Sequence, residues 1–160
     1  IAYNSLSTAI YRLRKLVRNE KFLQVSDGTI SLDNRYCWVD VWLYEKQLNE
    51  AKALWENSCE NQSCDQAIDL THHLIHCTKG PFLAAEQEPW VIAKRERIQN
   101  KILFCIGALG KHLQRQNLWE EAVDVYLKGI EIDAEFLIDG NIFQHMVLNC
   151  YTQSGIGQYF

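Results

Sequence analysis

Apolar residues at helical spacing mark the start of the chain. Between residues 4 and 18 they recur at intervals of three and four, at Leu6, Ala9, Ile10, Leu13, Leu16 and Val17. This spacing places them on one stripe of an α-helix and leaves the polar residues on the opposite face. The pattern therefore predicts an amphipathic helix over Asn4 to Arg18 whose apolar stripe is buried.

Two short runs in which apolar and polar residues alternate follow this helix, on either side of Asp27-Gly28. Asp-Gly is a strong signal for a two-residue hairpin turn, because both positions need a positive φ. The register that this turn imposes pairs Val25 with Ile30 and Leu23 with Leu32 on one face. The sequence thus predicts a helix followed by a β-hairpin.

Three further helical patterns lie between residues 40 and 116. Asp40 is a good N-cap for the first, Ser63 and Gln66 form a capping box for the second, and Pro89 opens the third. Gly80-Pro81 is expected to end the second helix. The apolar positions of the first helix are Leu43 or Tyr44, Leu48, Ala51 and Trp55. Those of the second are Ala67, Ile68, Thr71, Leu74 and Ile75. Those of the third are Ile98, Ile102, Cys105, Ile106, Leu109 and Leu113.

The segment from Ile106 to Ala134 resembles a tetratricopeptide repeat, which pairs two antiparallel helices. The matching positions are Leu109, Gly110, Leu113, Ala122, Tyr126, Gly129 and Ala134. The small residues let the helices approach closely, and Tyr126 fills the space beside them. A looser second copy starts near Ile138, with Met146, Tyr151 and Gly155. We therefore expect a mainly α fold, a tetratricopeptide-like helical bundle with an N-terminal helix and hairpin.

Composition is that of a folded chain, with 48% hydrophobic and 22% charged residues. No apolar run is long enough to span a membrane, and no signal peptide is recognisable. The six cysteines are therefore interpreted as reduced thiols of a cytoplasmic protein. The chain opens inside an expected element, so we interpret it as a piece of a longer protein.

Charge is distributed unevenly along the chain. Residues 1–21 carry five basic residues against one acidic residue, and the remainder must carry a net charge of −8 to give the total of −4. A basic end on an acidic body suggests that only the first end meets a polyanion. A basic helix face exposed to solvent is the simpler alternative.

A basic, hydrogen-bonding ridge is predicted opposite the apolar stripe of the first helix. It comprises Asn4, Thr8, Tyr11 and Lys15, with Arg12 and Arg18 beside them. Lys15, Arg12, Arg14 and Arg18 are the candidates for phosphate contacts, while Asn4, Thr8 and Tyr11 would approach bases. Arg14 lies nearer the edge of the apolar stripe, where a structural ion pair is the alternative.

The stretch from Leu6 to Leu16, with its Leu13-Arg14 pair, resembles the third helix of an OmpR-type winged helix. That resemblance implies that the helix enters the major groove of DNA and that the hairpin is the wing. The elements that precede this helix in the family are missing from the chain. The hairpin tip carries Asp27 and no Lys or Arg, so Arg35 just beyond the hairpin is the candidate for a contact there.

The order of features along the whole chain resembles the bacterial transcriptional activation domain, which follows the winged helix in activators of the antibiotic-regulatory-protein type and in some response regulators. The features are Val39-Asp40-Val41, Gly80-Pro81-Phe82-Leu83, Trp90, Arg95-Glu96-Arg97 and the tetratricopeptide-like unit. The resemblance implies a partial winged helix over residues 1–36 and a helical regulatory domain over residues 37–160.

The resemblance also implies the partners. Double-stranded DNA is the expected partner of the winged helix, and RNA polymerase or another protein is the candidate partner of the helical domain. A homodimer is compatible with paired DNA half-sites, although the sequence shows no heptad seam. No membrane contact and no cofactor are expected.

The sequence offers less support for two further hypotheses, a zinc site and an enzyme. Cys59, Cys64, His72 and His76 have spacings that zinc ligands can adopt, but the histidines lie opposite the apolar stripe of their helix, so a solvated polar face is the simpler reading. We find no phosphate-binding Gly loop, nucleophile elbow or metalloprotease motif. The sequence therefore does not indicate an enzyme.

The main alternative is a protein–protein interaction module of tetratricopeptide type without direct DNA binding. Such bundles commonly bind a peptide or a helix in a groove. On this alternative the basic first helix is only a packing element. Exposure of the ridge beside the hairpin would favour DNA, and burial of the ridge under the helical body would favour the interaction module.

Overall fold

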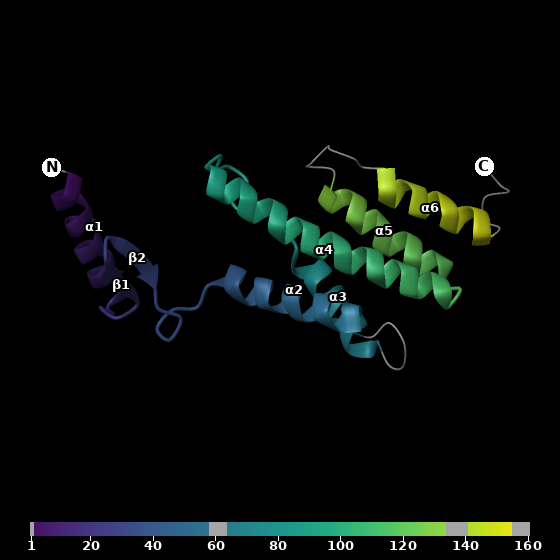
Figure 1. The fold of residues 1–160 in the computed structure, drawn as a ribbon, viewed down its shortest axis with the longest axis horizontal. Helices are drawn as coiled ribbons and strands as arrows, with labels where there is room; N and C mark the ends of the chain where they lie inside the picture. Colours follow the sequence, from purple (N-terminus) through teal and green to yellow (C-terminus); the bar gives the residue numbers. More distant parts are fainter. Residues whose placement is uncertain (1, 58–63, 134–140, 155–160) are drawn as a thin grey trace. The chain divides into compact units, whose positions relative to one another are not determined.

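The computed structural model describes the backbone of residues 2–57, 64–133 and 141–154, and the side chains of 5–57, 64–132 and 143–154. It is mainly helical, with one small antiparallel sheet (Figure 1). The elements are α1 (Ala2–Val17), β1 (Leu23–Ser26), β2 (Thr29–Leu32), α2 (Asp40–Asn57), α3 (Asp65–Cys77), α4 (Pro89–Arg115), α5 (Trp119–Asp133) and α6 (Asn141–Ser154).

The chain divides into two compact units, Ile1–Leu43 and Tyr44–Phe160. The division falls within the first turn of α2, shortly after the domain boundary at residues 36 and 37 that the sequence suggested.

The first unit contains α1 and the hairpin. The register is the predicted one, with Leu23 opposite Leu32 and Val25 opposite Ile30. Asp27 and Gly28 have φ values of 50° and 75°, as a two-residue turn of this kind requires. Within the hairpin the chemistry of two turn residues is therefore enough to fix the pairing of both strands.

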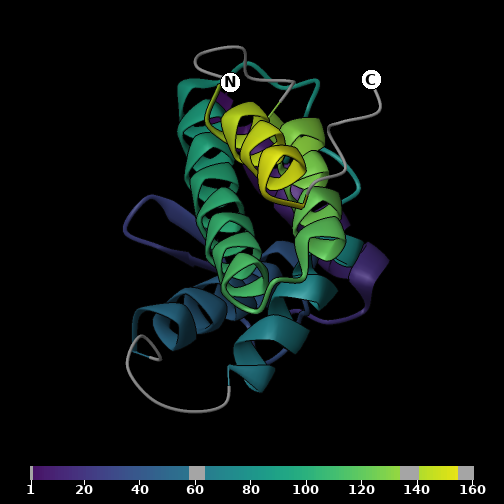
Figure 2. The same ribbon diagram turned by 90° about the vertical axis from the view of Figure 1, so that its right-hand side faces the viewer.

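The second unit is built on α4, the longest described helix. Figures 1 and 2 show α4, α5 and α6 side by side. Most positions predicted to be apolar on α2, α3 and α4 form the core: Leu48, Ala51, Ala67, Thr71, Leu74, Ile102, Cys105, Ile106 and Leu109 are at most 1% exposed. At the first predicted position of α2, Leu43 is exposed and Tyr44 is half-buried against the core. Burial of Cys105 raises the pKa of its thiol to about 11.

Helices α4 and α5 approach closely at Gly110. A Cβ atom at this position would lie 2.2 Å from Cε1 of Tyr126, and Tyr126 is completely buried. The hydroxyl of Tyr126 donates to Oε1 of Gln114 at 3.2 Å, and Nε2 of Gln114 lies 3.0 Å from Sγ of Cys150. One polar chain thus joins α5, α4 and α6, and burial raises the pKa of Tyr126 to about 12.

Helices α2 and α3 are joined through a buried hydrogen bond, in which Nε1 of Trp55 donates to Oγ1 of Thr71 at 2.9 Å. Helix α3 ends at Cys77, before the predicted stop at Gly80-Pro81. The reason lies in Thr78, which has extended backbone angles and whose amide and hydroxyl both donate to the carbonyl of Leu74. Of the predicted capping box, Ser63 lies outside the described residues, and Cys64 occupies the N-cap position.

Some predicted features of the tetratricopeptide-like segment, at Ala134, Ile138 and Gly155, also lie outside the described residues. Of the helices that the structure describes, none is both long and apolar enough to cross a membrane.

Candidate nucleic-acid interface

Helix α1 ends in a tight left-handed turn. Arg18 has a φ of 55°, a conformation that ends a helix, and its amide donates to the carbonyl of Lys15 at 3.3 Å. The side chain of Asn19 then accepts a hydrogen bond from the amide of Lys21 at 2.9 Å. These local contacts lead the chain from α1 into β1.

The ridge that the sequence predicted on α1 is exposed. Thr8, Tyr11, Arg12, Lys15 and Arg18 all have exposed side chains. Nζ of Lys15 lies 5.3 Å from the centre of the Tyr11 ring, within the range of a cation–π contact. Asn4 belongs to α1, but its side chain lies outside the described residues. The exposed ridge therefore presents three cationic groups, the phenol of Tyr11 and the hydroxyl of Thr8.

Arg14 is oriented differently from the rest of the basic residues. It is half-buried, and its Nη2 donates to the carbonyl of Leu23 at 2.8 Å. Its Nε is buried without a hydrogen-bond partner in the described part of the chain. Arg14 therefore links α1 to the hairpin through a backbone carbonyl, where the sequence suggested an ion pair or a phosphate contact.

The prediction that the apolar stripe of α1 is buried is wrong for the described residues. Leu6, Leu13, Leu16 and Val17 are 48%, 46%, 80% and 48% exposed. Among the described side chains of α1, those of residues 5–17, only Ile10 and Arg14 are half-buried. Arg14, at the edge of the stripe, contacts the hairpin through the carbonyl of Leu23.

The hairpin offers fewer contacts to a polyanion than the sequence suggested. Arg35 was the candidate for a contact near the wing, but its Nε and Nη2 both donate to the carboxylate of Asp33, the latter at 2.7 Å. Asp33 is buried, whereas the Arg35 side chain is 71% exposed. Part of the guanidinium charge is thus neutralised inside the protein.

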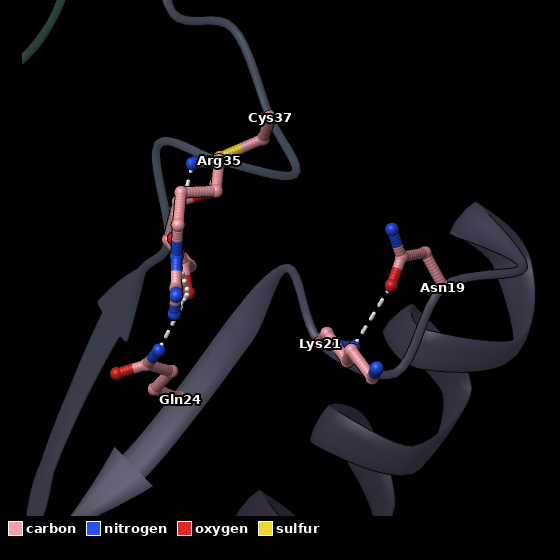
Figure 3. A network of polar contacts seen from close by, with 6 residues as sticks. Asn19, Lys21, Gln24, Arg35 and Cys37 are labelled. Atoms are coloured by element: carbon pink, nitrogen blue, oxygen red, sulfur yellow. Dashed lines mark hydrogen bonds and ion pairs between the residues drawn. The ribbon is translucent and has the colours of Figure 1, made fainter.

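Asp33 organises the segment that follows β2, because Gln24, Arg35 and Cys37, labelled in Figure 3, all donate hydrogen bonds to it. Its carboxylate also accepts from Nε2 of Gln24 at 2.7 Å and from the amide of Arg35 at 3.0 Å. Its carbonyl accepts from the amides of Tyr36 and Cys37. Sequence reasoning missed this residue, although an Asp at the end of a strand before polar residues is a known turn signal.

The contacts of two cations with the ring of Tyr36 were also missed. Nζ of Lys21 and Cζ of Arg35 lie 5.9 Å and 5.6 Å from the centre of its ring. The exposed cations of the first unit therefore continue from α1 to the base of the hairpin, while the tip carries Asp27.

The carboxylate of Asp33 predicts a pH dependence of the first unit. The hydrogen bond from Arg35 lowers its pKa from 3.8 to about 2. Because the folded-state pKa lies below the unfolded one, the carboxylate stabilises the fold above about pH 4, and this contribution disappears as the pH falls towards 2. We expect the protection of the hairpin amides against exchange, relative to an unfolded chain at the same pH, to fall across this range. The variant Asp33→Asn should lose that pH dependence. If the stability of the wild-type hairpin did not change with pH over this range, the stabilising role of the Asp33 carboxylate would be contradicted.

The described residues provide no observation that supports the alternative zinc site. Cys59 lies outside the described residues, and no group of three or more potential ligands comes together in the part of the chain that the structure describes. His72 and His76 are exposed on α3. The described cysteines, Cys37, Cys64, Cys77, Cys105 and Cys150, are free thiols.

Comparison with protein-family models, with curated proteins and with solved structures finds no match for this chain.

Proposed function

We propose that this chain is part of a bacterial transcription regulator, in which α1 and the hairpin bind duplex DNA and the helical unit regulates that activity. The observation that carries the proposal is the exposed ridge of Thr8, Tyr11, Arg12, Lys15 and Arg18 on one helix, with a hairpin directly after it. A helix of this kind fits the major groove, and cationic side chains along it fit the flanking phosphates.

The charge balance supports the same assignment. The first unit, residues 1–43, carries six basic and four acidic residues, and the second carries ten basic and sixteen acidic ones. A polyanion is therefore attracted to the first unit and repelled by most of the second.

The packing of the helical unit supports a tetratricopeptide-like arrangement of that unit. Helix α5 returns antiparallel to α4, since Gln99 contacts Ile132 and Gln114 contacts Tyr126. The close approach at Gly110 matches the position where the repeat has a small residue. Such a unit suits contacts with RNA polymerase or another protein.

The decisive measurement is the salt dependence of DNA binding by the full chain carrying Lys15→Ala. Removing one phosphate contact should weaken binding and reduce the slope of log K against log salt by about one. Lys111→Ala is the matched control, because Lys111 is exposed on α4 in the second unit. An unchanged slope in Lys15→Ala would remove this residue from the interface, and no binding of folded protein at low salt would reject DNA binding altogether.

A second candidate function, protein binding by α1, is favoured by a different observation. Leu13, Leu16 and Val17 are exposed on one side of the helix, and apolar surface of this kind commonly marks a contact with another protein. On this candidate, Leu16→Asp would abolish partner binding, whereas Lys15→Ala would have little effect.

A further inference from the structure

The second unit contains a groove alongside α2 and α4 that the proposed DNA contact does not use. Contacts between the two helices advance in the same direction along both, from Glu45 with Arg97, through Asn49 with Lys101, to Lys52 with Phe104. The groove has a volume of about 440 Å³, and Lys52, Glu96, Arg97, Asn100, Lys101 and Phe104 are among the residues that line it.

Positive charge gathers at this groove although the unit around it is acidic. Residues 44–160 contain ten basic and sixteen acidic residues. Three of those ten basic residues, Lys52, Arg97 and Lys101, line the groove, and Glu96 is the single acidic side chain among its described lining residues. Such a local reversal of charge favours an anionic ligand.

Lys101 keeps hydrogen-bonding capacity for a ligand. Its Nζ donates to Oδ1 of Asn49 at 2.6 Å, and no carboxylate among the described residues forms an ion pair with it. An ammonium group has three donors, so donors remain for a further acceptor. Because Asn49 uses its oxygen on Lys101, its NH₂ group is also left to donate.

The guanidinium of Arg97 is held in place by the carboxylate of Glu45. Its Nη2 donates to Oε1 of Glu45 at 3.0 Å, and its side chain is 61% exposed. Lys94 pairs with the other oxygen of Glu45, so two cations share one carboxylate. The contact with Glu45 fixes the guanidinium of Arg97. Because two cations share this one carboxylate, a net positive charge remains for a ligand.

The groove also has an apolar part. The ring of Phe104 is 41% exposed, and Nζ of Lys52 lies 5.5 Å from its centre. Lys52 contacts only one carboxylate among the described residues, that of Glu56 at 3.5 Å, on the surface of α2. An apolar side chain of a ligand can cover the ring while a nearby carboxylate approaches Lys52.

We propose that this groove binds an acidic peptide segment in which carboxylates alternate with bulky apolar side chains. The carboxylates accept hydrogen bonds from Lys101, Arg97 and Lys52, and an apolar side chain covers Phe104. The inference does not depend on DNA binding by α1, because its residues all belong to the second unit.

The test uses the full chain and a fluorescein-labelled peptide of alternating glutamate and leucine, with fluorescence anisotropy as the readout. We expect saturable binding that weakens with salt, and no binding of the same peptide with glutamine in place of glutamate. Lys101→Gln and Lys52→Gln should each weaken binding by about fivefold or more. Lys128→Gln is the control, since Lys128 is exposed on α5 and pairs with Glu131.

The outcomes that would contradict peptide binding by the groove differ from those that would contradict DNA binding by α1. Equal binding of the glutamine peptide, or equal loss in Lys128→Gln, would overturn the groove assignment. If duplex DNA displaces the peptide and Lys101→Gln weakens DNA binding as much as peptide binding, the groove is a polyanion surface and the peptide assignment fails. Loss of DNA binding in Lys15→Ala with unchanged peptide binding would support both proposals.

Discussion

Replacing Gly110 with alanine is expected to lower the free energy of unfolding of the helical unit by about 2–3 kcal/mol. The new Cβ would lie 2.2 Å from Cε1 and 2.3 Å from Cζ of Tyr126. The ring cannot rotate away at low cost, because Tyr126 is completely buried and its hydroxyl is bonded to Gln114. Helices α4 and α5 would have to separate, and the surrounding core would lose contacts.

Urea unfolding followed by tryptophan fluorescence measures this effect. Gly107→Ala is the matched control on the same helix, since a Cβ there has nothing within 4 Å. It should stabilise the protein by roughly 0.5–1 kcal/mol, because alanine has the higher helix propensity. Similar behaviour of the two variants would mean that the close approach at Gly110 is absent in solution. A double-mutant cycle with Tyr126→Ala should show strong coupling at Gly110 and none at Gly107.

Replacing Arg95 with methionine is expected to destabilise the same unit by about 2 kcal/mol. Arg95 is only 8% exposed. Its Nε donates to the carbonyl of Phe82 at 2.8 Å, and its Nη2 donates to those of Leu83 and Glu86 at 2.5 Å and 2.9 Å. These bonds hold the segment between α3 and α4 in place, including Leu83, whose φ of 47° is unfavourable for a leucine.

The loop itself provides a second readout for Arg95→Met. Trypsin should cut after Lys79 faster in the variant, because the segment that follows is no longer fastened to α4. Arg97→Met is the control: the side chain is 61% exposed, so its ion pair should contribute less than about 1 kcal/mol. Unfolding of Arg95→Met at the wild-type urea concentration, with unchanged proteolysis, would show that the segment is held by other contacts.

The candidate interface could be predicted only in part. The spacing of Thr8, Tyr11, Arg12, Lys15 and Arg18 predicted a ridge on one helix face, and all five are exposed. The inward role of Arg14 could not be predicted, since it depends on a carbonyl nine residues further along the chain. The pairing of Arg35 with Asp33 was likewise missed, because charge counts do not show which cations are already bound within the protein.

The sequence by itself determined the approximate positions of the helices, the hairpin and the pairing of its strands. These features depend on local chemistry: helical periodicity for α2 to α4, Pro89 at the start of α4, and positive φ at Asp27 and Gly28. Periodicity also identified the core of the helical unit, because several amphipathic helices there bury their stripes against one another.

Only the tertiary structure decided which of these faces are covered and which polar groups are occupied. The stripe of α1 has the same periodicity as that of α4, yet Leu13 and Leu16 are exposed while Ile102 and Ile106 are buried. The roles of Arg95 and Lys101 also depend on partners distant in sequence. Periodicity records the side on which a helix is apolar, but burial requires a partner surface, and that surface comes from contacts made elsewhere in the fold.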